Sequence, residues 1–195
     1  MRCIKNNAAI ETLPAQKQWS FKGVAVLPDI LAENLKAVIV GTAIGEASAS
    51  RGHYYAGLGN DFWKLLHQSG LTPTLLWPED NHTLPFYRIG LSDLNKTLSQ
   101  SHDRGLHFDA TGLLERMLGM QPDWVAFHGK TAAHAYARAF DYPRPGLGRQ
   151  AWKVGLSDVF VLPQSSGANR RNDYDGRPSR LLWWREFAEL IHCES

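Results

Sequence analysis

Two stretches of the chain repeat the same order of features: a short apolar run, a glycine, and then an amphipathic helical segment. Residues 38–40 precede Gly41, and residues 124–127 precede Gly129. An uninterrupted apolar run ended by glycine is typical of a parallel strand covered on both faces. Strands that alternate with helices predict an α/β fold, a three-layer α/β/α sandwich around a central, mainly parallel sheet of about four strands.

The remaining elements follow from periodicity and capping residues. Two more strands are expected at residues 86–91 and 159–162. Residues 72–85, rich in Pro, Asp and Asn, are predicted to form a surface loop. Helices are expected in five places: residues 29–35, after Asn60, after Asp109, after Thr131, and from about Ser179 onward.

Composition limits the domain count and the possible partners. With 195 residues, 44% apolar residues and seven Trp, the chain can bury one sizeable core. We therefore expect an N-terminal extension at residues 1–20 and a single domain at residues 21–195. A net charge of +2 excludes a strongly basic coat for nucleic acid but allows a local basic patch.

Cysteine usage and hydropathy indicate the compartment. Cys3 and Cys193 lie at opposite ends of the sequence, which suggests no disulfide framework, and the histidines are scattered without ligand spacing, so no metal is expected. The sequence shows neither a signal peptide nor a run long enough to span a bilayer. A soluble cytoplasmic protein without a membrane partner is the expectation.

The loop between residues 41 and 61 is too long for a simple strand-to-helix connection and therefore suggests a functional insertion. In parallel α/β sheets the ligand site gathers at the carboxyl ends of the strands. Three segments should meet there: the loop after Gly41, the Ser92–Asp93 turn and the loop after Pro163. Their glycine spacings match neither a P-loop nor a dinucleotide fingerprint, which argues against nucleotide hydrolysis.

Two segments, RGHYYAGLGNDFWKLLHQSGLT and VLPQSSGANR, give the chain a family resemblance. Over residues 37–191 it resembles the mismatch-specific uracil-DNA and thymine-DNA glycosylases of the uracil-DNA glycosylase superfamily. The first motif of that family reads Gly-Ile-Asn-Pro-Gly, and its Asn helps to position the attacking water. Here the same segment is Gly41-Thr42-Ala43-Ile44-Gly45, so a methyl group stands in place of the amide.

The resemblance implies a monofunctional uracil-DNA glycosylase of base excision repair. Such a hydrolase breaks the N-glycosidic bond of deoxyuridine after flipping the nucleotide out of DNA. It would need no cofactor and would act as a monomer on double-stranded DNA, with tolerance of single strands. Backbone N–H groups of the first motif would stabilise the departing uracil anion. The residues assigned to base binding are Gly41, Thr42, Ala43, Ile44, Gly45, Tyr55 and Asn60.

Tyr55 and Asn60 each also have an ordinary structural explanation. The resemblance places Tyr55 beneath the flipped base, and we favour this role over that of a core tyrosine beside Trp63. Asn60 matches a site residue of the family, although its role as a helix cap already explains it.

Three residues are candidates for catalysis. Asp93 could accept the N3–H of uracil, which cytosine lacks, or could simply cap a turn. Glu46 and His53 could orient the water that Ala43 cannot hold. The alternatives are an exposed glutamate and a hydrogen-bonded loop histidine.

The closing segment is expected to contact DNA. Ser165, Ser166 and Gly167 can approach phosphate oxygens, and Ala168 occupies the position of the side chain that enters the duplex in the family. Because its methyl group fills little space, Asn169, Arg170 or Arg171 could serve instead. Arginines at positions 170, 171, 177 and 180 suggest a phosphate track, or else a solvated loop paired with Asp173 and Asp175.

Two other functions remain open. Ala43 and Ala168 also fit a module that binds uracil or abasic sites without turnover, and an α/β protein that handles free nucleobases or nucleotides is a third possibility. A lyase that uses Lys64 or Lys130 is less favoured, because both lysines stand at helix starts.

Overall fold

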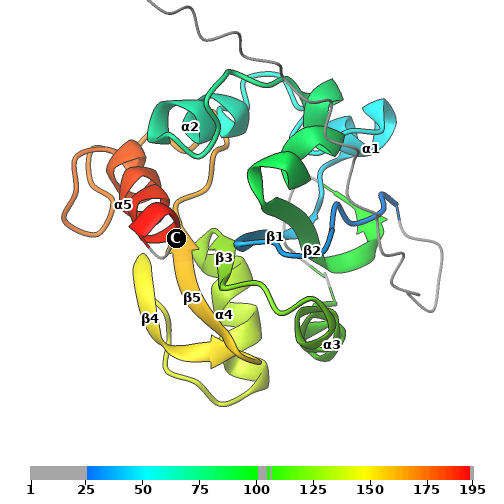
Figure 1. Cartoon of the computed structure of the whole chain (residues 1–195), viewed down its shortest axis with the longest axis vertical. Helices are drawn as coiled ribbons and strands as arrows, with labels where there is room; N and C mark the ends of the chain where they lie inside the picture. The colour runs from blue at the N-terminus through cyan, green and yellow to red at the C-terminus, as the bar shows by residue number, and fades with distance from the viewer. Residues whose placement is uncertain (1–25, 101–104, 106, 194–195) are drawn as a thin grey trace, which may run out of the picture.

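The computed structural model describes residues 26–100, 105 and 107–193, and Figure 1 shows their arrangement. The extension expected at residues 1–20 lies outside this part of the chain. The sheet has five strands in the order β2-β1-β3-β5-β4. Their bounds are β1 (Ala37–Ile44), β2 (Ile89–Ser99), β3 (Trp124–His128), β4 (Gly148–Val154) and β5 (Ser157–Leu162).

Four of the strands are parallel, and β4 alone runs antiparallel, to its neighbour β5. The predicted mainly parallel α/β/α sandwich is therefore confirmed. The expected count of about four strands omitted β4, because its exposed and buried residues mix in a segment rich in Pro and Gly.

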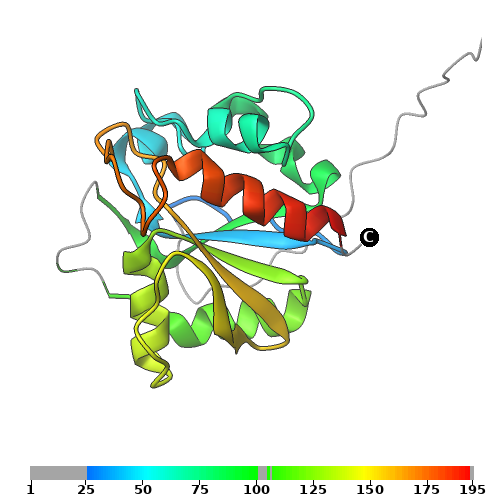
Figure 2. The same ribbon diagram turned by 90° about the vertical axis from the view of Figure 1, so that its left-hand side faces the viewer.

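Helices cover both faces of the sheet. Figure 2 shows α2 (Phe62–Ser69) and α5 (Arg180–Cys193) on one face, and α3 (Ala110–Met120) and α4 (Lys130–Ala139) on the other. A short helix, α1 (Glu46–Arg51), follows β1, and a 3-10 helix, η1 (Pro78–Tyr87), precedes β2. Asp109 caps α3 by accepting the backbone N–H of Gly112 at 2.8 Å, as predicted.

The two covered faces of β1 explain why its residues 37–40 form an uninterrupted apolar run. Ala37 and Ile39 belong to the core under α2 and α5, whereas Val38 and Val40 belong to the core under α3 and α4. Successive side chains of a strand point to opposite faces, so a strand covered on both sides must be apolar throughout.

Three local predictions were wrong. Residues 29–35 form no helix, because Ile30 makes an antiparallel bridge with Leu91. The segment expected as a surface loop at residues 72–85 includes most of η1. Strand β2 begins at Ile89 and continues to Ser99, so Ser92 and Asp93 lie inside a strand rather than in a turn.

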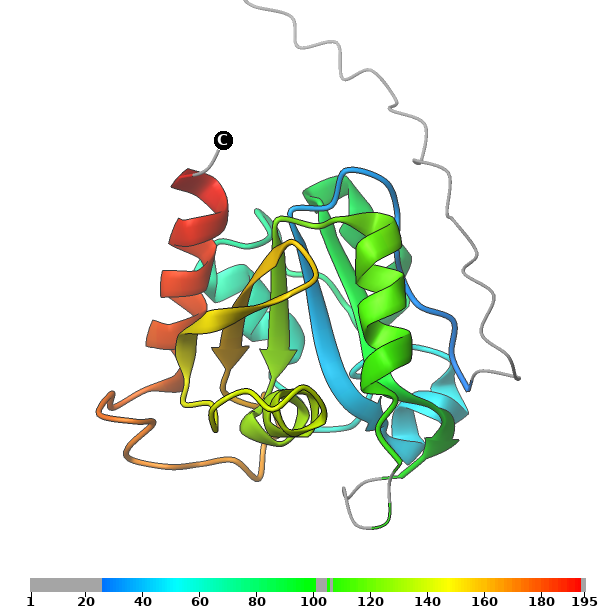
Figure 3. The same ribbon diagram turned by 90° about the horizontal axis from the view of Figure 1, so that it is seen from below.

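The arrowheads of β1, β3 and β5 point to one edge of the sheet in Figure 3, where residues 45–61 and 163–179 gather. This edge is where ligand sites of open parallel sheets lie. Across the described helices, none is both long and apolar enough to cross a membrane.

Candidate active site and DNA-binding surface

The site begins where β1 and β2 lie side by side. Gly41 is the register partner of Asp93. A Cβ atom on Gly41 would lie only 2.3 Å from Asp93 Oδ1 and 3.6 Å from the Tyr55 hydroxyl. The missing side chain of Gly41 therefore leaves the space that the Asp93 carboxyl occupies, and three residues predicted to form the site lie close together.

Asp93 is only 2% exposed, and its Oδ2 atom has no hydrogen-bond partner among the described residues. The Tyr54 hydroxyl, adjacent to this carboxyl, accepts a hydrogen bond from Lys96 Nζ at 3.0 Å. Lys96 also pairs with Asp29 at 2.7 Å. Burial raises the pKa of Asp93 from 3.8 to about 7, although the positive charge of Lys96 opposes the shift.

Near neutral pH a large share of Asp93 is thus an uncharged carboxyl group, which can donate as well as accept a hydrogen bond. Tyr54 and Lys96 were not recognised from the sequence. Both are polar residues in segments whose burial is set by tertiary packing.

Tyr55 has the left-handed backbone conformation, with φ of 53°. Its ring stacks on Phe62, with centroids 3.7 Å apart and an interplanar angle of 12°, and meets the edge of His128 at 5.0 Å. The side chain is partly buried and packs against the core. Phe62 thus fixes the plane of a tyrosine ring whose hydroxyl lies near Asp93.

His128 is the last residue of β3 and links this ring to the second loop. Its Nε2 atom accepts the backbone N–H of Ser165 at 2.9 Å. Burial lowers the pKa of His128 to about 3, and the charge of Arg180 acts in the same direction. The imidazole is therefore neutral, with its proton on Nδ1. Its position at the carboxyl end of a predicted strand was a signal that sequence reasoning did not use.

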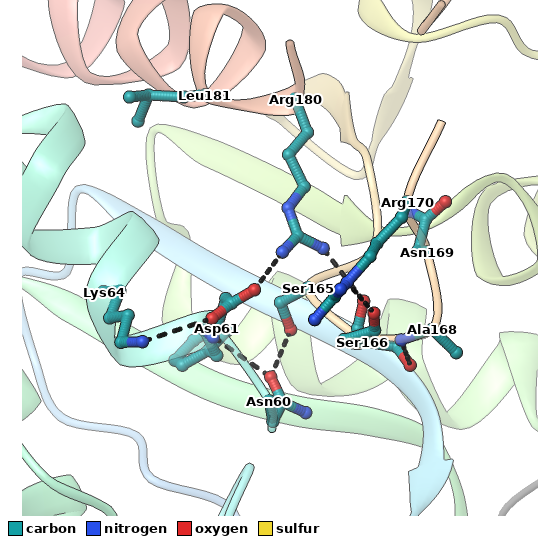
Figure 4. A network of polar contacts seen from close by, with 12 residues as sticks. Asn60, Asp61, Lys64, Ser165, Ser166, Ala168, Asn169, Arg170, Arg180 and Leu181 are labelled. Carbon is teal, nitrogen blue, oxygen red and sulfur yellow. Dashed lines mark hydrogen bonds and ion pairs between the residues drawn. The ribbon is translucent and has the colours of Figure 1, made fainter. Parts of the chain in front are cut away.

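Polar contacts hold the two loops together, as Figure 4 shows. Asn60 Oδ1 accepts hydrogen bonds from the Phe62 backbone at 3.0 Å and from Ser165 Oγ at 2.7 Å. Asp61 donates its backbone N–H to the Ser165 carbonyl at 3.0 Å. Arg180 donates to the Asp61 carboxylate and to the carbonyl of Ser166. Because Oδ1 is doubly occupied, the Asn60 amide presents its NH₂ group away from this network.

The closing loop is held by hydrogen bonds from its own side chains to its backbone carbonyls. Arg170 Nε donates to the Gly167 carbonyl at 3.1 Å, and Asn169 donates to the carbonyl of Gln164 at 2.9 Å. The exposed Ser166 and Ala168 complete the turn.

Two of the four arginines in the expected phosphate track are engaged elsewhere. Arg177 pairs with Glu186, and Arg180 pairs with Asp61. Arg170 and Arg171 are exposed. The positive charge available to a ligand is therefore concentrated on Arg170 and Arg171.

The other predicted residues lie at the margin of this group. Glu46 is exposed at the start of α1, and His53 Nδ1 lies 3.0 Å from Asn81 Nδ2 on η1. Ile44 is buried in the core, whereas Thr42, Ala43 and Gly45 are partly buried. Within the described part of the chain, no three His, Cys, Asp or Glu residues gather as metal ligands would.

Fold and site together define an α/β/α protein in which two loops meet beyond the carboxyl ends of parallel strands. The sequence profile of the Uracil DNA glycosylase superfamily matches residues 28–188. The chain belongs to this superfamily, and so to the DNA glycosylases of base excision repair, hydrolases that act on DNA.

A solved structure agrees with this membership. The solution NMR structure of a candidate uracil DNA glycosylase from Methanosarcina acetivorans is similar to this chain, with 25% identity and a TM-score of 0.55. The match covers 85% of this chain and 96% of that protein.

Proposed function

We propose that this protein is a monofunctional uracil-DNA glycosylase that hydrolyses the N-glycosidic bond of deoxyuridine in DNA. The observation that carries the proposal is the meeting of Tyr55, Asp93 and Gly41 beside a second loop fixed through Asn60 and Ser165. A flipped uracil would stack against the Tyr55 ring, which Phe62 holds in place.

The uncharged form of Asp93 suits the hydrogen-bonding edge of uracil. A carboxylic acid can accept the N3–H of the base through its carbonyl oxygen while its O–H donates to O4. Because bond cleavage leaves negative charge on the base, a neutral Asp93 is also a better neighbour than a carboxylate would be.

Backbone N–H groups at residues 42–45 and the outward NH₂ group of Asn60 are the proposed donors to the departing uracil anion. Exposed Arg170 and Arg171 would contact phosphates, which carry most of the affinity for DNA. Glu46 and His53 remain candidates for orienting the water.

The test is single-turnover cleavage of a uracil-containing duplex, read by alkaline strand scission at enzyme excess. Tyr55→Ala should lose most of the rate, whereas Tyr142→Ala, which removes an exposed ring stacked on Trp152, should retain it. Absence of cleavage by the unmodified protein would exclude the proposal.

Ala43 favours a second candidate function, a protein that retains uracil or abasic sites without turnover. Its side chain cannot hydrogen-bond a water molecule. Tight binding of abasic duplex together with negligible uracil release would support this function, and repeated turnover would exclude it.

A further inference from the structure

Leu58 is exposed to 91% of its maximum, the highest value among the large apolar side chains of the described residues. A single exposed leucine is common on protein surfaces and means little by itself. The position of Leu58, on a well-supported turn beside the closing loop, distinguishes it from an ordinary surface leucine.

Leu58 stands at the corner of a tight turn. The backbone N–H of Asn60 donates to the Gly57 carbonyl at 3.1 Å, and Gly59 has φ of 74°. Such a turn requires a positive φ at its third residue, which glycine supplies at no steric cost. The side chain of the second residue therefore projects outward from a compact backbone.

The turn is anchored on both sides. The backbone N–H of Ala56 donates to Ser48 Oγ at 3.0 Å, and the side chain of Arg51 donates to the Ala56 carbonyl. After the turn, the backbone N–H of Asp61 donates to the carbonyl of Ser165. Leu58 is thus an apolar side chain on a supported turn, not on a loose loop.

The turn also abuts the closing loop. A Cβ atom on Gly167 would lie 2.3 Å from the Gly59 carbonyl oxygen, so the two backbones touch where neither residue has a side chain. The turn that carries Leu58 therefore touches the loop that carries Ala168. That alanine has only a methyl group with which to fill a gap in a base stack.

We propose that Leu58 is the side chain that enters the DNA duplex and occupies the space left by the flipped nucleotide. The inference rests on the proposed function, because it assigns a residue to the step that extrudes the base. An apolar side chain inserted between base pairs offsets the unstacking that base flipping requires. The partner is double-stranded DNA, with exposed Arg170 on the neighbouring loop available to its phosphates.

The decisive comparison is Leu58→Ala against Leu156→Ala. Leu156 is 70% exposed at the turn between β4 and β5, at the end of β5 opposite the site. Both changes remove an exposed leucine and should leave stability nearly unchanged. Single-turnover cleavage of uracil is measured in a duplex and in a single strand.

Leu58→Ala should lower the duplex rate by about ten- to a hundredfold, because no side chain replaces the extruded nucleotide, and should change the single-strand rate by less than about threefold. Leu156→Ala should match the unmodified protein on both substrates. Transfer of the leucine to the other loop, in the double variant Leu58→Ala/Ala168→Leu, should restore part of the duplex rate.

A second readout does not depend on cleavage of the N-glycosidic bond. A duplex with 2-aminopurine next to the uracil becomes more fluorescent when the stack opens, and this rise should be smaller with Leu58→Ala at saturating protein. If Leu58→Ala gives the duplex rate and the fluorescence of the unmodified protein, the proposal is wrong. A loss of duplex cleavage confined to Arg170→Ala would instead assign the inserted side chain to the closing loop. Absence of cleavage with every variant would reject the proposed function, while the fluorescence would still decide the role of Leu58.

Discussion

Replacing Asp93 with asparagine is expected to remove one contribution to stability, which declines as pH rises. Burial raises the pKa of this carboxyl from 3.8 to about 7. Between these values the folded protein holds a proton that the unfolded chain has released. The stabilisation is therefore complete at pH below 3.8 and disappears as pH rises through about 7. The charged or polar groups around Asp93 include Lys96, Asp29, Tyr54, Tyr55 and Arg116.

The size of the effect follows from the pKa shift. Each pH unit in this interval changes the free energy of unfolding by about 1.4 kcal/mol, so the contribution of Asp93 falls by roughly 2–3 kcal/mol between pH 5 and pH 8. His128 acts in the opposite direction, because burial lowers its pKa from 6.5 to about 3. Its unfolded form takes up a proton below pH 6.5, which lowers stability at pH 5 by about 2 kcal/mol relative to pH 8.

These two contributions nearly cancel in the unmodified protein. Urea unfolding at pH 5, 6, 7 and 8 should therefore give a nearly constant free energy, whereas Asp93→Asn should gain about 2 kcal/mol over the same range because only His128 still titrates. Asp158→Asn is the control, since the pKa of Asp158 is lowered by its hydrogen bond with Lys153 and this residue titrates below the range. Parallel pH profiles for the unmodified protein and Asp93→Asn would refute the assignment of a raised pKa.

Three further predictions concern the site. Gly167→Ala should separate the two loops and lower single-turnover cleavage of duplex by about tenfold or more, because a Cβ atom 2.3 Å from the Gly59 carbonyl oxygen forces a backbone shift. Gly57→Ala is the control, since its added atom would meet nothing closer than 3.9 Å. Arg180→Met should reduce the free energy of urea unfolding by about 1–3 kcal/mol, because it removes hydrogen bonds to the Asp61 carboxylate and to the carbonyls of Gln164 and Ser166. The exposed Arg185→Met should change it little. Above pH 7 the cleavage rate should fall by up to about tenfold per pH unit as Asp93 ionises, and Asp93→Asn should remove that decline. A flat pH profile of the unmodified protein would show that cleavage does not need the protonated carboxyl.

The parts of the fold that were predictable are those in which one local pattern decides the structure. Residues 37–40 of β1 are apolar throughout because both faces are covered, and Gly70 ends α2 with φ of 89°. Strand β2 was misjudged for the opposite reason. Its polar residues Ser92, Asp93, Asn95 and Lys96 suggest exposure, yet all four are buried because partners distant in the sequence surround them.

The candidate site likewise has one part that was predictable from the sequence and one part that was not. The two loops were predicted from their length and position, and contacts such as Ser165 to Asn60, 105 residues apart, join them. The electrostatic character of the site was not predictable, since the pKa values of Asp93 and His128 depend on burial that only the tertiary structure creates. A turn cap and a buried acid cannot be told apart by a sequence pattern alone.

Ala43 is less surprising in a site where Asp93 can be protonated and His128 is neutral. If uracil hydrogen-bonds to Asp93 as proposed, a full negative charge on that carboxyl would repel the charge that develops on the departing base. Protonation of Asp93 avoids this repulsion, and neutral His128 adds no charge that would need a counterion. Lowering the energy of the leaving anion accelerates bond breaking however the water is oriented, because the sugar becomes cationic as the base leaves. A site that stabilises the leaving base can therefore tolerate weak activation of the water, and this is the condition under which the Gly41-Thr42-Ala43-Ile44-Gly45 segment is compatible with catalysis.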